Sequence, residues 1–226
     1  MTKELLLDSW VFFKNNFLGL CLIILPFAIP IEIFTTFFDY NISPDESHPA
    51  SLIPSVIDLL FYPIYAAATV FYIASVAYGE RISRNAAWGF GIRMWRSYLI
   101  MYVILTTLVV FGFVLIIPGF ILAARLSFSE FELLLNKKSP LESIRSSWDF
   151  SRNYFWLLLR GGVVITLIVY TPYLTLASLL DKSSIVFWML DLTSNIAYAA
   201  LATMYTIFAF RVYDFATKEH NKAKQE

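Results

Sequence analysis

The chain has 226 residues, of which 58% are hydrophobic, and its mean hydropathy is +0.65. A soluble domain is about 45–50% apolar, so this composition argues against an ordinary soluble protein. The net charge is zero, which excludes the basic field expected of a protein that binds nucleic acid. One cysteine, Cys21, and two distant histidines, His48 and His220, provide no metal-ligand spacing. We therefore expect no metal and no cofactor.

Five apolar segments are long enough to cross a membrane, which takes about 20 mostly apolar residues per helix. They are residues 17–38, 52–78, 97–117, 154–180 and 185–210. The first is longer than the apolar region of a secretion signal, and no small-residue cleavage site follows it. We therefore interpret it as a retained crossing.

The distribution of charge predicts a sixth crossing at residues 120–135, after Pro118-Gly119. This segment is short and contains Arg125, Glu130 and Glu132. Basic loops stay in the cytoplasm, so an even number of crossings should separate the two central basic loops. We expect six crossings with both termini cytoplasmic and Pro118-Gly119 as an outer turn; a re-entrant segment gives the same sidedness. The basic positions are Lys3, Lys14, Arg81, Arg84, Arg93, Arg96, Lys137, Lys138, Arg145, Arg152, Lys218, Lys222 and Lys224, whereas residues 39–51 contain Asp39, Asp45 and Glu46 and no Lys or Arg.

Three amphipathic stretches adjoin the basic segments, at residues 5–16, 83–96 and 139–153. They contain Trp10, Trp88, Trp95 and Trp148. Tryptophan is enriched at headgroup depth, and basic side chains face anionic lipid. We predict three interfacial helices that contact anionic headgroups at the cytoplasmic face. In the third, Ser139-Pro140 suits a helix N-terminus, because serine caps and proline fits the first turn.

An internal repeat is indicated by the pattern S-W-x-F-x-[K/R]-N-x-F, which occurs at residues 9–17 and 147–155. Each copy leads directly into an apolar run. The chain therefore divides into three units, residues 1–79, 80–136 and 137–217, followed by a cytoplasmic tail, 218–226. The predicted fold is an all-α polytopic membrane bundle in one domain, with about six transmembrane helices, three interfacial helices and a possible threefold repeat.

The segments I-P-G-F-I-L-A-A-R-L-S at 117–127 and S-P-L-E-S-I-R-S-S-W at 139–148 resemble the signature of YciC-like bacterial inner-membrane proteins. They are also similar to the membrane domain fused to some glycerophosphodiester phosphodiesterases. Ser143 departs from the alanine usual in that signature, and Glu130 and Glu132 occupy a stretch that is usually apolar. The resemblance implies a location in the bacterial inner membrane and a fold, but no activity.

Charges within the apolar segments are the candidate functional residues, because they are costly in a bilayer and often functional. Counting along the helices places Arg125 at a depth similar to that of Glu32, Asp58 and Asp191, so we predict an ion-pair layer. It is either a packing device or a site for an anion, a headgroup or protons. Glu132 lies nearer the cytoplasm, within reach of Arg160 or Arg211.

No nucleotide-binding, hydrolase or metalloprotease motif is present, so we expect a protein that is not an enzyme. The first hypothesis is an accessory or envelope-maintenance protein that acts through lipid or protein contacts, with no particular protein partner indicated. The alternative is a small transporter or channel. A third, weaker hypothesis is a lipid-modifying enzyme that uses Glu130 and Glu132.

Overall fold

A computed structural model describes residues 2–41, 52–80, 82–179 and 184–223, and no strand occurs in these ranges. The acidic residues Asp45 and Glu46, as well as Arg81, Lys182 and Lys224, lie outside the described residues. The helices are α1 (Thr2–Asn41), α2 (Leu52–Ala77), α3 (Arg84–Phe113), α4 (Ile117–Arg125), α5 (Ser129–Leu134), α6 (Pro140–Phe150), the 3-10 turn η2 (Ser151–Tyr154), α7 (Phe155–Ala177), α8 (Ile185–Leu201) and α9 (Thr203–Ala223).

Five helical stretches are long and apolar enough to cross a membrane, which confirms the all-α membrane bundle. They are α1, α2, α3, the α6–α7 stretch and the α8–α9 stretch. Residues 120–135 do not form the single helix that the sequence predicts. α4 has nine residues and α5 has six, so each alone is too short to span a bilayer.

Two of the three predicted interfacial helices are not separate elements. Residues 5–16 continue into the crossing as part of α1, and residues 83–96 are the start of α3. Neither junction contains a glycine or a proline that would break the helix. Only α6 is a distinct helix, which η2 joins to α7. Its N-terminus confirms the predicted cap, because Ser139 and Glu142 form a reciprocal capping box.

The turn between α3 and α4 lies earlier than predicted. α3 ends at Phe113, and Pro118 stands in the first turn of α4 rather than in the connection. Proline is favoured there because a first-turn N–H has no partner within the helix. Ile116 precedes α4 with φ of 58°, a strained conformation for a β-branched residue.

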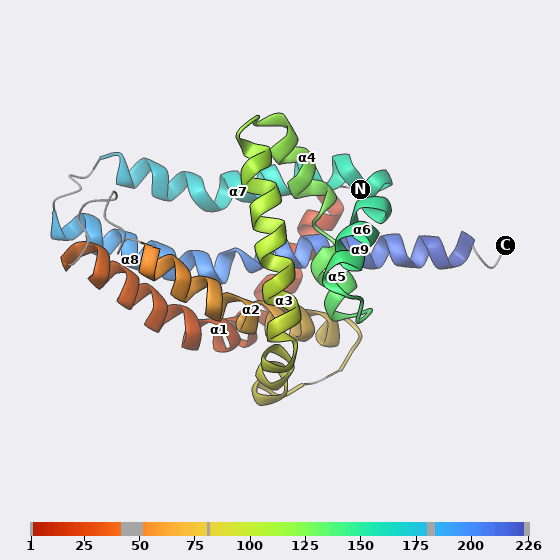
Figure 1. The fold of residues 1–226 in the computed structure, drawn as a ribbon, viewed down its shortest axis with the longest axis horizontal. Coiled ribbons are helices and arrows are strands. Elements are labelled where there is room, and N and C mark those ends of the chain that lie inside the picture. Colours follow the sequence, from red (N-terminus) through yellow and green to blue (C-terminus); the bar gives the residue numbers. More distant parts are fainter. Residues whose placement is uncertain (1, 42–51, 81, 180–183, 224–226) are drawn as a thin grey trace.

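α1, α2, α7, α8 and α9 run along the long axis of the molecule, whereas α3 runs across it (Figure 1). The start of α1 and the end of α9 lie toward the same end of that axis, and the end of α7 and the start of α8 lie toward the other. The middle third of the chain is therefore arranged differently from the outer thirds, and the threefold repeat stays a prediction.

Candidate functional site

Two serines of the neighbouring segment bind the backbone just before the short helix α5. The Ser147 hydroxyl accepts a hydrogen bond from the Phe128 N–H at 3.1 Å and donates one to the Arg125 carbonyl at 2.9 Å. Ser151 donates to the same carbonyl at 2.8 Å. These bonds occupy backbone groups that the break between α4 and α5 frees. Ser143, Ser147 and Ser151 are fully buried.

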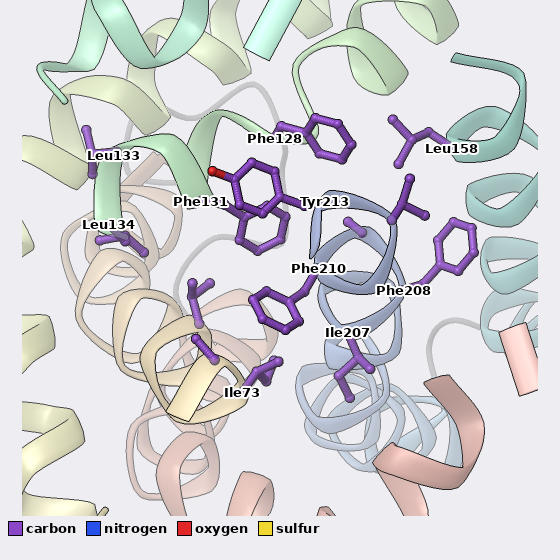
Figure 2. Close-up of a cluster of buried hydrophobic side chains, with 14 of the residues drawn as sticks. Ile73, Phe128, Phe131, Leu133, Leu134, Leu158, Ile207, Phe208, Phe210 and Tyr213 are labelled. Carbon is purple, nitrogen blue, oxygen red and sulfur yellow. The ribbon is translucent and has the colours of Figure 1, made fainter. Parts of the chain in front are cut away.

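An aromatic cluster packs α5 against α9. Figure 2 shows Phe128 and Phe131 beside Phe210 and Tyr213, with Leu158 of α7 nearby. The Tyr213 ring centroid lies 5.3 Å from that of Phe128 and 5.2 Å from that of Phe131. All four rings are buried. We call these four rings the aromatic layer; Tyr213 lines one of the two cavities described below, and the three phenylalanines line neither.

The first cavity is apolar, has a volume of about 670 Å³ and is bordered by residues of α2, α3, α4, α5, α7 and α9. Its polar groups are few and include Glu130, Ser127 and the hydroxyls of Tyr62, Tyr98 and Tyr205. Its lining also includes large apolar side chains that are exposed on the protein surface, among them Val110, Phe113, Phe120, Val163 and Leu167. The cavity therefore adjoins surface that is suited to hydrocarbon.

Glu130 lines this cavity without a cationic partner. Its Oε2 accepts a hydrogen bond from the Tyr98 hydroxyl at 3.0 Å, and no Lys or Arg among the described residues forms an ion pair with it. Burial raises the pKa of Glu130 to about 7, against the smaller opposing effect of the Tyr98 hydrogen bond. Glu130 is thus poised to change charge near neutral pH.

Glu132, two residues further along α5, lines a different and polar cleft of about 950 Å³ between α5, α6 and α9. Its carboxylate pairs with Lys138 Nζ at 2.6 Å and accepts hydrogen bonds from Tyr213 at 3.0 Å and Asn136 at 3.2 Å. Burial alone would raise the pKa of Glu132, but these hydrogen bonds and the charge of Lys138 together outweigh burial and lower it. The two glutamates of α5 therefore differ in both surroundings and charge state.

The comparison with known families identifies the chain. The family model of the uncharacterised protein family UPF0259 matches residues 49–215, which is most of the chain. This protein belongs to UPF0259. The matched stretch includes α5 and every residue that lines the apolar cavity. Neither a curated protein nor a solved structure matches the sequence.

Three of the acids that the sequence singled out in this UPF0259 protein lie together between α1, α2 and α8. Glu32 is close enough to Asp58 and Asp191 for their charges to interact. Asn195 lies near Glu32 and donates to Asp191 at 3.3 Å. Tyr65 lies near Asp58, and Tyr173 donates to Asp191 at 2.7 Å. Within the described residues, no group of His, Cys, Asp and Glu has a metal-binding arrangement.

Arg125 does not join these acids, contrary to the prediction. It ends α4, and its guanidinium stacks on the Trp148 ring at 4.5 Å and donates to the Trp148 carbonyl. The break between α4 and α5 turns the end of α4 toward α6, and this sets the direction of the Arg125 side chain.

The predicted inner pair also differs from the structure, because Lys138 and not Arg160 or Arg211 is the partner of Glu132. Arg160 lies 6.0 Å from the Trp156 ring, and Arg211 lies 5.0 Å from the Phe12 ring. Both cations are thus placed against aromatic faces.

The four tryptophans predicted to contact lipid divide into two pairs. Trp10 is 44% exposed and Trp148 is 40% exposed, and each has a cation over its ring. Trp88 and Trp95 are half-buried, and their indole N–H groups donate to the carbonyls of Ile23 and Leu60. The second pair thus connects α3 to α1 and α2.

The cavity around Glu130 is the part of the site that the sequence analysis did not predict. Glu130 was considered there only as one of two possible catalytic carboxylates. Its lining residues come from six helices, and in the sequence they are spread from Tyr62 to Thr206. The one available signal was a glutamate in an apolar run with no basic residue one helical turn away.

Proposed function

We propose that this UPF0259 protein is a non-enzymatic membrane protein that binds a lipid-like molecule in the apolar cavity and acts through that contact. The cavity of about 670 Å³ carries this proposal. Its size is in the range of about 300–1,000 Å³ typical of small-molecule sites, which are likewise mostly apolar with a few polar groups. Its surroundings are apolar helices in a bundle, where hydrocarbon is the available ligand.

The site is better suited to binding than to catalysis. Glu130 and Glu132 line different cavities, and no residue lines both. Two carboxylates that act as general acid and base must reach the same substrate. The described cavities therefore do not support the hypothesis of a lipid-modifying enzyme.

A small transporter is the alternative, and it has less support. The expected layer of Arg125, Glu32, Asp58 and Asp191 is divided between two regions, and none of these residues lines either cavity. The absence of a shared lining residue between the two cavities also favours a binding site over a continuous path.

The rest of the proposal concerns location and surroundings. We infer a bacterial inner-membrane protein with both termini cytoplasmic, in agreement with the YciC resemblance and the basic segments. The positions of the first turns of α1 and the last turns of α9 toward one end of the molecule support this (Figure 1). Exposed Trp10 and Trp148, each beside a cation, support contact with anionic headgroups.

Two adjacent valines of α7 provide the test. Val163 lines the cavity and is 39% exposed, whereas Val164 does not line it and is 40% exposed. Val163→Trp should fill the cavity and lower the occupancy of copurified lipid about tenfold, since overpacking costs on the order of a few kcal/mol. Val164→Trp should have no effect. Native mass spectrometry of both variants measures the bound lipid, and equal lipid occupancy in the two would refute the proposal.

A further inference from the structure

The carboxylate of Glu130 has unused acceptor capacity within the apolar cavity. An ionised carboxylate offers about four acceptor positions, and the described residues supply one hydrogen bond, from Tyr98. Of the other nearby hydroxyls, those of Ser127 and Tyr205 are paired with each other at 2.6 Å, and Ser127 also donates to the Ala123 carbonyl. The rings of Tyr62 and Tyr102 stack with their centroids 4.5 Å apart.

The charge of Glu130 is also uncompensated. α4 and α7 contribute no charged side chain to the cavity, and Glu130 is the only charged residue among all the described residues that line it. Titratable groups that face Glu130 are Tyr62 from α2, Tyr98 from α3 and Tyr205 from α9. An isolated buried charge is costly unless a counter-charge reaches it. A bound ligand can supply that counter-charge.

We propose that the cavity selects a single-chain amphiphile with a positively charged amine, bound with its chain along α3 and α7 and its amine against Glu130. This inference rests on the proposed function and adds the chemical class of the ligand. An anionic head would meet the like charge of Glu130, and an uncharged head would leave it uncompensated. Apolar lining residues accommodate the chain, namely Leu105, Val109 and Val110 of α3 and Leu158, Val163 and Leu167 of α7.

The protonation of Glu130 makes this selection depend on pH. Burial raises the pKa of Glu130 to about 7, so the carboxylate gains charge as pH rises from 6 to 8. An alkylamine stays cationic from pH 6 to 8, because its amine resembles that of lysine, which has a pKa of about 10.4. Tyrosine in a model peptide has a pKa of about 10, so the hydroxyls around Glu130 stay neutral over this range. Amine affinity should therefore increase with pH, while the affinity of an uncharged analogue stays constant.

Dodecylamine, dodecanol and dodecanoate test the proposal, because they share one chain and differ in head charge. Equilibrium binding is measured with the full chain in nanodiscs of uncharged lipid, and empty nanodiscs correct for partition into the bilayer. At pH 8 the amine should bind about tenfold more tightly than the alcohol, and dodecanoate should bind most weakly. At pH 6 the advantage of the amine over the alcohol should shrink.

Glu130→Gln should abolish the advantage of the amine over the alcohol and leave dodecanol binding unchanged. The pH series on the unmodified protein tests the role of the Glu130 charge without a substitution. Equal affinity for amine and alcohol at pH 8, with no change at pH 6, would overturn the proposed ligand class. Failure of all three probes to bind, or binding unaffected by Val163→Trp, would instead overturn the lipid-binding function itself.

Discussion

The indole Nε1 of Trp95 donates a hydrogen bond of 2.7 Å to the carbonyl oxygen of Leu60. Leu60 stands three residues before Pro63, inside α2. Trp88 repeats the arrangement, because it donates at 3.1 Å to the carbonyl of Ile23, three residues before Pro26 in α1. A helix-interior proline removes a ladder donor and displaces the preceding turn. The donors lost are those to the Leu59 and Leu22 carbonyls, and the adjoining carbonyls of Leu60 and Ile23, in the same displaced turns, accept hydrogen bonds from α3.

Replacing either tryptophan should therefore destabilise the bundle. Trp95→Phe and Trp88→Phe keep an aromatic ring but lose the donor, so each should lower the free energy of unfolding by about 1 kcal/mol, as for interhelical hydrogen bonds in membranes. Trp156→Phe is the control, because Trp156 is 64% exposed and no hydrogen bond from its indole to a described residue is present. Thermal unfolding in detergent measures all three, and equal losses at all three positions would contradict the hydrogen-bond explanation.

Gly91 is the point at which α3 crosses α2. A Cβ at this position would lie 2.1 Å from the Ile64 carbonyl oxygen, whereas a Cβ at Gly89 would meet nothing within 4 Å. Gly91→Ala should therefore destabilise the protein by about 2 kcal/mol, because the helices must separate. Gly89→Ala should stabilise it by up to about 1 kcal/mol through helix propensity. Unfolding temperatures that shift in the same direction for both would refute the close crossing.

Arg125 and Trp148 should be energetically coupled. Arg125→Leu removes the contact with the ring and the hydrogen bond to the Trp148 carbonyl, which should cost about 1–2 kcal/mol. A double-mutant cycle with Trp148→Leu should give an interaction energy of at least about 0.5 kcal/mol. The same cycle with Glu32→Gln should be additive, because these two residues do not meet. Coupling to Glu32 would restore the ion-pair layer predicted from the sequence.

Local signals in the sequence predicted local structure well. The start of α2 at Leu52 and the Ser139 cap follow from hydropathy and capping rules. Counting residues along the apolar segments also predicted a similar depth for Glu32, Asp58 and Asp191. Depth does not specify which way a helix faces, however, and the interruption after Arg125 turned that side chain toward α6. The cavity around Glu130 depends on how six helices pack, which no local pattern encodes.

The partner of Glu132 was missed because of a turn. Lys137 adopts a φ of 54°, and the chain reverses there so that Lys138 comes back to α5. Positive φ is rare for a non-glycine residue, so nothing in the residue types indicated the reversal. The spacing of residues along the helices instead predicted Arg160 or Arg211 as the partner of Glu132.

The ion pair between Lys138 and Glu132 should control how stability depends on pH. The folded-state pKa of Glu132 is lowered, below the unfolded value of about 4.3. The stabilisation is thus fully present above that unfolded value and is lost as pH falls through the folded pKa. Lys138→Met leaves Glu132, which is 4% exposed, without its cation. At pH 7 this variant should lose about 2 kcal/mol, less than for a fully buried pair because Lys138 is partly exposed.

Lys138→Met should also flatten the pH profile. Once the cation and its hydrogen bond are absent, burial is opposed only by the hydrogen bonds from Asn136 and Tyr213, so the pKa of Glu132 rises toward its unfolded value. The stability that the unmodified protein loses through this residue as pH falls is therefore smaller in the variant. Lys137→Met is the control, because Lys137 is exposed and forms no ion pair with a described residue. Unfolding temperatures of the unmodified protein and both variants between pH 4 and 8 measure the effect. Parallel pH profiles for the two variants would show that the charge of Lys138 does not hold Glu132 ionised.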